Sequence, residues 1–266
     1  MSTLMYNSAT DIKVERDYLA NLQTPAPMGK RHAPYPFHAF ATDTVDAIER
    51  AGYTIEQEDY AITKDEQRMF GLLNVSRPVV PDAPTFGVPA LHRPKWNLLV
   101  ALRGAHDQSI SRGLAIGSQV MVCSNLCFHG DLGNWNSKQT TNIAYRIPDM
   151  VADAVAGLGN AGRKLTIDFD SFNAKQITRE TGDKVLLDIY RSGGFSASQM
   201  GRAVDDWDKC SVEEHTANGR NLWWLFSSCT HALKPTGANT NHGDIQHRST
   251  IVYNKIANAP RELLAA

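Results

Sequence analysis

Residues 96–131, WNLLVALRGAHDQSISRGLAIGSQVMVCSNLCFHGD, decide the fold of this chain. The stretch opens with an apolar run over 96–103 and closes with a second one over 119–128, and runs of this length between turn residues are typical of buried strands. Glycine and polar residues at 104–109 predict a turn. We therefore expect an antiparallel meander at the centre of a sheet, with the loosely alternating 110–116 between the two buried runs.

The sequence on either side extends this picture to an α+β fold. Upstream, 53–63 and 68–76 alternate apolar and polar residues around a short turn, which predicts a hairpin with a bulge in its first strand. Before this hairpin, 42–52 predicts a short helix that Gly52 ends. Downstream, helical patterns dominate: 150–162 predicts a weak helix, 163–169 could be a strand or the start of a helix, and Ser196 is expected to cap a helix over 196–209. Strands followed by helices predict a central antiparallel sheet with a mainly helical C-terminal half packed on it. The expected divisions are an irregular N-terminal arm over 1–40 and a single α+β domain over 41–266, which is β-rich over 53–130, has a Pro-rich loop at 77–94 and is α-rich over 149–258.

Composition bounds the function. Lys and Arg number 27 and Asp and Glu 28, which leaves a net charge of −1. Proteins that coat nucleic acid usually carry a basic excess, so such a role here needs a local basic patch. The sequence has no run of about 18 apolar residues, so it predicts no membrane-spanning helix. The N-terminus carries charges where a secretory leader needs an apolar core. Cys123 and Cys127 lie in an apolar stretch and are interpreted as buried free thiols, so we expect a reducing cytoplasm.

The turn after the first buried run gathers polar groups: Arg103, His106, Asp107 and Ser109. Loops held by a rigid sheet are common places for binding and catalytic residues. His106 is the candidate acid or base near neutral pH, with Asp107 beside it. The structural alternative is a tight turn in which Asp107 and Ser109 bond to backbone groups.

Two further groups could bind a metal ion. His129 and Asp131 follow the second buried run with the spacing of two residues that points side chains in the same direction. His242, Asp244 and His247 lie at the expected start of the last helix, where Asp244 could instead interact with the helix dipole. A metal-dependent phosphodiesterase or nuclease would require His106, Asp107, His129 and Asp131 to converge. No cofactor is predicted, and a divalent metal enters only with this alternative.

Several motifs with a known mechanism do not occur. The chain has no P-loop, no dinucleotide-binding glycine motif, no H-E-x-x-H, no G-x-S-x-G and no C-x2-C pair. The sequence therefore leaves open whether the chain is an enzyme and favours a protein that is not one.

Basic and aromatic residues recur along the chain and could contact a nucleic acid through phosphates and stacked bases. The candidates are Arg93, Lys95, Arg103, Arg112, Trp135 and Arg146, and the same reasoning extends to Lys30, Arg31, His32 and Tyr145. Solvated loop charges are the alternative. The pair Trp223 and Trp224 lies in an apolar helix and is expected in a core or an interface.

These residues also carry a resemblance. The turn and the second buried run, through Arg103, His106, Asp107, Gly117, Val122, Cys123, Asn125 and Leu126, resemble the signature of the phage/plasmid-like proteins of unknown function. The helix over 221–233 is more weakly similar to a later helix of that family, through Trp223 or Trp224 and Thr230. The resemblance implies an origin in a mobile genetic element and no established activity.

Three functional hypotheses follow. The leading one is a phage or plasmid accessory protein of DNA metabolism that binds single-stranded DNA in annealing or recombination. The second is the metal-dependent phosphodiesterase or nuclease. The third is a module that binds a host protein through the loop at 77–94 and the aromatic residues of 35–40. A homo-oligomer is compatible with the first and the third, and no membrane partner is expected.

Overall fold

The computed structural model describes residues 11–76, 96–120, 125–128, 133–209, 219–234 and 242–259. The Pro-rich loop at 77–94 lies outside these ranges, and so do Arg93, Lys95, His129 and Asp131. Contacts divide the chain into two compact units, which are described separately below. The first unit comprises 1–124 and 132–159, and the second comprises 125–131 and 160–266.

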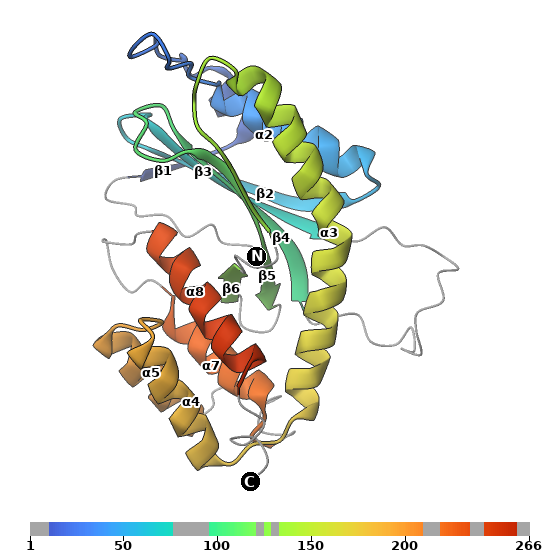
Figure 1. Ribbon diagram of the computed structural model, residues 1–266, viewed down its shortest axis with the longest axis vertical. Coiled ribbons are helices and arrows are strands. Elements are labelled where there is room, and N and C mark those ends of the chain that lie inside the picture. The colour runs from blue at the N-terminus through green and yellow to red at the C-terminus, as the bar shows by residue number, and fades with distance from the viewer. Residues whose placement is uncertain are drawn as a thin grey trace. The chain divides into compact units, whose positions relative to one another are not determined.

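The first unit is built on an antiparallel sheet with the predicted strand at 96–103 near its centre (Figure 1). The next part of the predicted meander has other bounds, because one strand spans 112–120 and, within the described ranges, 125–128 is the part of the predicted strand at 119–128 that forms a strand of its own. Val100 in the middle of β4 pairs with Leu73 of β3 on one side and with Ile116 of β5 on the other. All three are buried, so the apolar run at 96–103 forms an interior strand, as predicted. The strands are β1 Asp11–Val14, β2 Thr54–Thr63, β3 Arg68–Ser76, β4 Trp96–Ala105, β5 Arg112–Val120, β7 Asn134–Ser137 and, in the second unit, β6 Asn125–Phe128.

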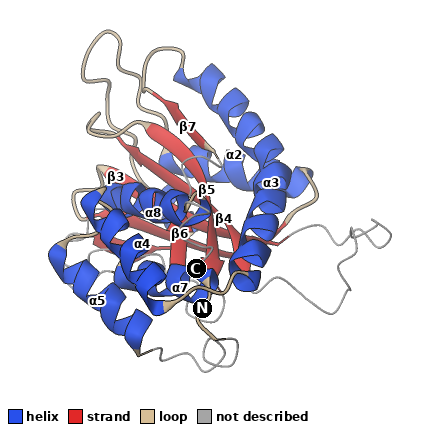
Figure 2. Ribbon diagram, turned by 60° about the horizontal axis from the view of Figure 1, so that its bottom comes forward, coloured by secondary structure: helices blue, strands red, loops and turns tan. Residues whose placement is uncertain are grey.

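The hairpin predicted upstream is also present. β2 pairs with β3 in antiparallel register, and the register shifts between Ile55 and Gln57, where the sequence predicted a bulge. β7 pairs with the first half of β5, from Arg112 to Ala115 (Figure 2). The turn between β4 and β5 therefore lies at an end of the sheet that β7 also reaches.

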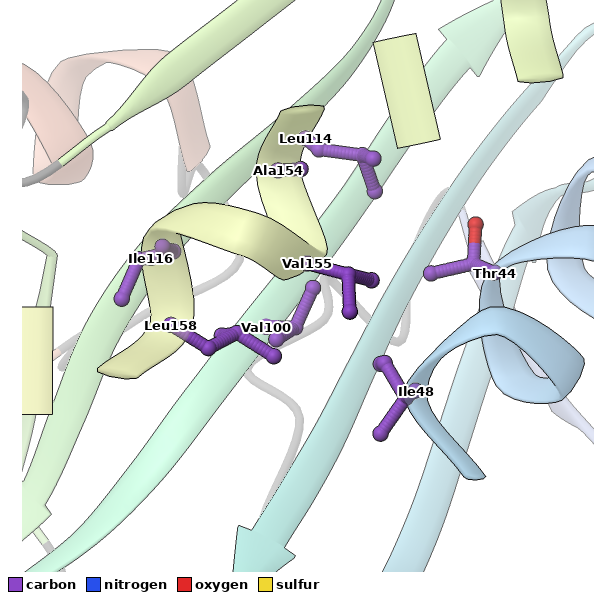
Figure 3. Close-up of a pocket in the computed structure, with 8 residues that line it drawn as sticks. All are labelled: Thr44, Ile48, Val100, Leu114, Ile116, Ala154, Val155 and Leu158. Carbon is purple, nitrogen blue, oxygen red and sulfur yellow. The ribbon is translucent and has the colours of Figure 1, made fainter. Parts of the chain in front are cut away.

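Two helices cover one face of this sheet. Thr44 and Ile48 of α2 and Ala154, Val155 and Leu158 of α3 surround a small apolar space whose floor is Val100, Leu114 and Ile116 (Figure 3). The helices within the described ranges are α1 Arg16–Ala20, α2 Phe37–Arg50, α3 Ile143–Ala174, α4 Arg179–Arg191, α5 Ala197–Asp208, α7 Leu222–Ala232 and α8 His242–Ala257. The α+β class is thus confirmed.

The N-terminal arm is more ordered than predicted. Within 11–40, β1 pairs with β2, α1 follows it, and α2 begins at Phe37 directly after Pro36. The expectation of an irregular arm over 1–40 is wrong for 11–20 and for 37–40, because a four-residue strand and a five-residue helix leave little pattern and α2 starts directly after a proline. It is right for 21–36, where the described chain is irregular apart from the bridge of His32. The predicted end of α2 is correct: Gly52 takes a φ of 83°, which suits glycine after a helix.

The expected single domain over 41–266 also differs from the structure, because the boundary between the units falls inside α3. This helix has 32 residues and hence a length of about 48 Å. The sequence predicted a weak helix from 150 and an ambiguous segment at 163–169. Instead the helix runs through both, and its apolar residues at Leu158, Leu165 and Phe169 are buried.

The second unit has an aromatic core. Phe169 and Phe172 of α3 lie against α7, where the ring centroids of Phe169 and Trp223 are 4.9 Å apart. Phe172 also faces Tyr253 of α8. Trp223 and Trp224 are 5% and 7% exposed, which confirms that this pair belongs to a core. None of the helices within the described ranges is long and apolar enough to cross a membrane.

Candidate functional site

In the first unit, a buried polar cluster lies at the end of the sheet where the turn joins β4 to β5. Arg103 pairs with Gly113, so their neighbours Gly104 and Arg112 share the opposite face, the one that α2 and α3 cover. Arg112 lies directly over Gly104: a Cβ on this glycine would come within 2.5 Å of Arg112 Cδ and 3.0 Å of Cζ. The absence of a side chain at Gly104 is what lets the arginine lie flat on the sheet.

Arg112 is 0% exposed, although it carries a guanidinium group. Nη2 donates to the Tyr35 carbonyl oxygen and lies 3.3 Å from Nδ1 of His106, and Cζ lies 4.3 Å from the centroid of Phe37. Nε and Nη1 have no hydrogen-bond partner among the residues that the structure describes. Burial lowers the pKa of Arg112 to about 9, against an opposing influence of Tyr35. At neutral pH the group is still charged.

His106 is the neighbour of Arg112 and is 3% exposed. Its ring lies over Phe37 at a centroid distance of 4.0 Å, and its backbone N donates to Gln67 O at 2.7 Å. Burial, and then the positive charge of Arg112, lower the pKa of His106 to about 4. The imidazole is therefore neutral at pH 7, and because Arg112 donates only, His106 Nδ1 accepts and Nε2 carries the proton.

A segment of the N-terminal region closes over this cluster. We call residues 28–36 the strap. His32 forms an antiparallel bridge with Thr140, and the Tyr35 backbone N donates to Gln139 Oε1 at 3.2 Å. His32 is 6% exposed, its Nδ1 accepts from the Met28 backbone N at 2.9 Å, and its Nε2 has no partner within the described part of the chain. An electrostatic interaction with His32 also lowers the pKa of His106, which places His32 near this group. We call His32, Phe37, His106 and Arg112 the Arg112 cluster, and its members come from two separate stretches of sequence, 32–37 and 106–112.

Asp107 has a different role from the one expected of a catalytic partner. Its Oδ1 accepts from the backbone N of Ser109 at 2.9 Å, and its Oδ2 forms an ion pair with Arg68 at 3.1 Å. Burial alone would raise the pKa of Asp107, but the bonds from Ser109 and the hydrogen bond and charge of Arg68 hold it below its ordinary value. These contacts match the tight-turn alternative, in which Asp107 and Ser109 bond to backbone groups.

The candidates for nucleic-acid contact do not share one surface. Arg103 is half-buried on the other face of the sheet, where it donates to Asn136 Oδ1 at 3.0 Å. Arg112 is buried, which removes it from any exposed phosphate-binding surface in this conformation. The ring of Trp135 is also half-buried and packs over Gly133 and Gly157. Of the candidates within the described ranges, Arg146, Tyr145, Lys30 and Arg31 are exposed.

A second, exposed group surrounds the start of α3. Tyr145, in the first turn of this helix, is 80% exposed, and Arg146 beside it is exposed as well. The bridge between His32 and Thr140 holds the strap with its exposed Lys30 and Arg31 next to the chain that enters α3, which carries the exposed Lys138. We call Lys30, Arg31, Lys138, Tyr145 and Arg146 the α3 surface. Lys138 was not predicted, because a single lysine between polar residues carries no pattern.

The metal candidates are placed only in part. His242, Asp244 and His247 all lie on α8, which begins one residue before the predicted start, and His247 is exposed. Among the described residues there is no group of three or more His, Cys, Asp or Glu side chains that could hold a metal ion. Convergence of His106 and Asp107 with His129 and Asp131 stays a prediction, since the latter two lie outside the described ranges.

The geometry thus defines an α+β protein with a helix-covered antiparallel sheet, whose polar end combines a buried arginine–histidine cluster with an exposed basic and aromatic surface. No protein-family model, curated protein or solved structure matches the chain.

Proposed function

We propose that the chain binds single-stranded DNA through the α3 surface, as an accessory protein of phage or plasmid DNA metabolism. The observation that carries the proposal is Tyr145, an aromatic side chain that is 80% exposed in the first turn of α3 and directly precedes the exposed Arg146. Single-strand-binding proteins combine these two features, since aromatic rings stack on bases and a basic groove follows the phosphates. The mobile-element origin rests on the family resemblance of Arg103 to Leu126.

The local electrostatics favour an anionic partner in spite of the net charge of −1. The α3 surface contributes four cations: Lys30, Arg31, Lys138 and Arg146. The first turn of α3 has no acidic residue to offset them, and the positive end of the helix dipole adds to their field. Asp149, one turn further along, is also exposed and limits the surface on that side.

This count of charges predicts how binding depends on salt. For a single strand, log K falls with log of the salt concentration at a slope of about −0.7 for each phosphate neutralised. Four cations therefore predict a slope of about −3. A protein with a general basic excess would give a steeper slope, and one that binds through stacking alone would give a slope near zero.

The test is fluorescence anisotropy of a labelled oligothymidine at low salt, with the full chain and matched variants. Loss of one stacked base is worth about 1–3 kcal/mol, so Tyr145→Ala should weaken binding by about 5- to 140-fold. Arg146→Ala should weaken it less and make the salt slope shallower by about 0.7. Tyr190→Ala and Lys184→Ala are the controls, because these residues are likewise exposed but lie on α4 in the second unit.

The outcomes separate clearly. Weakening by Tyr145→Ala with unchanged binding in Tyr190→Ala supports the proposal. If Tyr145→Ala and Tyr190→Ala weaken binding equally, the DNA does not bind through the α3 surface. If anisotropy does not change at low salt with micromolar protein, single-stranded DNA is not the ligand.

A further inference from the structure

The unpartnered polar atoms of the Arg112 cluster are all hydrogen-bond donors. Arg112 Nε and Nη1 carry only N–H groups, and both lack a partner among the described residues. His32 Nδ1 accepts from the Met28 backbone N, so its proton is on Nε2, the atom that has no partner either. A buried donor without an acceptor is costly, and three of them in one cluster, one of them on a charged group, are unusual in a folded protein.

The chain's own neighbouring carboxylates are engaged elsewhere. Asp107 is bonded to Ser109 and Arg68, and Asp43 accepts the phenolic hydrogen of Tyr35 at 2.7 Å. Arg112 instead contacts the Tyr35 carbonyl oxygen, the neutral imidazole nitrogen Nδ1 of His106 and the ring face of Phe37. The cluster therefore presents a positive charge and several donors without a negative partner within the described part of the chain.

We propose that Arg112, His32 and His106 form a binding site for phosphate, either as the free ion or as a terminal phosphate group. Guanidinium is the side chain that best matches the geometry of an oxyanion, since its fork donates two parallel hydrogen bonds. Phosphate offers several acceptor oxygens, which suits the unpartnered donors of two side chains, Arg112 and His32. Because Nδ1 of His32 already accepts a hydrogen bond, the imidazole donates through Nε2 and adds no second buried charge.

Because Arg112 is 0% exposed, the proposal requires the strap to move away before phosphate can reach the guanidinium. The strap is held by the His32 bridge to Thr140, the Tyr35 bond to Gln139 and the Tyr35 carbonyl on Arg112. A phosphate oxygen replaces that carbonyl on Nη2 and supplies acceptors for Nε and Nη1. The strap also carries the exposed Lys30 and Arg31, which draw an anion to this part of the surface.

The site stands on other side chains than the α3 surface, so it does not rest on the proposal of DNA binding. Two-dimensional NMR of the imidazole groups of the full chain, titrated with sodium phosphate at pH 7 and with sodium chloride at equal ionic strength, tests it directly. The chain has nine histidines, and His32→Gln and His106→Gln assign the two signals concerned. We expect a saturable shift of these two signals with phosphate and none with chloride.

Arg112→Met should abolish phosphate binding, and Arg103→Met is the matched control. Arg103 directly precedes Gly104, the residue opposite Arg112 in the sheet, and therefore lies on the other face. The phosphate-dependent shift should vanish in the first and persist in the second. If Arg112→Met does not fold, the titration of the wild-type chain still decides. No saturable shift at tens of millimolar phosphate, or a shift confined to other histidines, would overturn the site.

An oligothymidine with a 5′-phosphate, compared with the same strand ending in a 5′-hydroxyl, separates the two sources of phosphate. A shift of the His32 and His106 signals with the phosphorylated strand alone assigns the site to a strand end. A shift with inorganic phosphate and with neither strand assigns it to the free ion. Binding of both strands without any histidine shift would leave the DNA proposal standing and refute the phosphate site.

Discussion

Gly104→Ala should destabilise the first unit strongly, and the structure says why. The new Cβ would lie 2.5 Å from Arg112 Cδ and 3.0 Å from Cζ. Arg112 is 0% exposed and donates to the Tyr35 carbonyl oxygen, so with the strap in place its side chain cannot move out toward solvent. Forcing an extra carbon into a packed interior costs about 1–3 kcal/mol. Displacing the guanidinium from the Tyr35 carbonyl loses a charged hydrogen bond as well, so we expect a total of about 2–3 kcal/mol.

The assay should report on the first unit alone, because a chain of two units need not unfold in one step. Hydrogen exchange of β4 and β5 amides, followed by mass spectrometry, meets this need. A loss of about 2–3 kcal/mol corresponds to exchange that is about 30- to 140-fold faster, given 1.4 kcal/mol per tenfold change. Amides of α4 and α5 in the second unit serve as the internal control and should keep their wild-type rates.

A double-mutant cycle with Arg112→Met isolates the cause. If the clash with Arg112 is responsible, Gly104→Ala should cost less than about 0.5 kcal/mol in the Arg112→Met background, because the flexible methionine can yield. Gly104 does not have a positive φ, so the backbone itself accepts alanine. A Gly104→Ala chain with wild-type exchange in β4 and β5, or an undiminished cost in the double mutant, would refute the packing of Arg112 over this glycine.

Other substitutions test neighbouring parts of the structure. The pKa of His106 is about 4 in the folded chain and 6.5 ordinarily. Between these pH values the unfolded chain binds more protons, so the free energy of unfolding falls as the pH drops from 6.5 to 4, by up to about 3 kcal/mol. His106→Gln should remove this pH dependence, and an equal loss of stability in the wild-type and variant chains would contradict the assignment to His106. Ser196→Ala should cost about 1 kcal/mol, seen as faster exchange at the start of α5, because it removes a capping box. Gly182→Ala should destabilise the second unit by about 1–3 kcal/mol, since its Cβ would meet the Trp207 ring 2.5 Å from Cε2. The helical control Gly201→Ala, with no atom within 4 Å, should stabilise α5 by up to about 1 kcal/mol in a thermal or urea melt.

Local sequence patterns predicted the sheet well, since strand alternation and turn residues act over a few positions. The hairpin of β2 and β3, its bulge near Ile55, the meander around Val100 and the cap at Ser196 all follow from such patterns. Long-range packing was not predictable in the same way. α3 passes through Gly157, Gly159 and Gly162 without a break, because buried residues on one face hold it together where helix propensity is weak.

The candidate site shows the same limit. The sequence placed His106 and Asp107 on one turn and suggested that they act together. In the fold, Asp107 bonds to the turn and to Arg68, whereas His106 lies in the interior beside Arg112. The groups that complete the cluster, His32 and Phe37, are about 70 residues away in the sequence, and no local pattern links them to the turn. Burial of an arginine is likewise invisible in the sequence, since the residue type favours the surface.

The stability of Arg112→Met bears on why the arginine is there. A buried guanidinium with two unpartnered nitrogen atoms reduces the stability of the fold, and replacing buried charges by apolar side chains of similar volume is often neutral or stabilising. If Arg112 served the fold alone, its removal should destabilise β4 and β5, because the methionine cannot bond to the Tyr35 carbonyl or to His106. If it serves a ligand, Arg112→Met should be at least as stable as the wild-type chain in phosphate-free buffer and should lose its response to phosphate. Local features that weaken a fold without an evident compensation are expected at functional sites. The stability of Arg112→Met and its response to phosphate together decide whether the Arg112 cluster is a functional site.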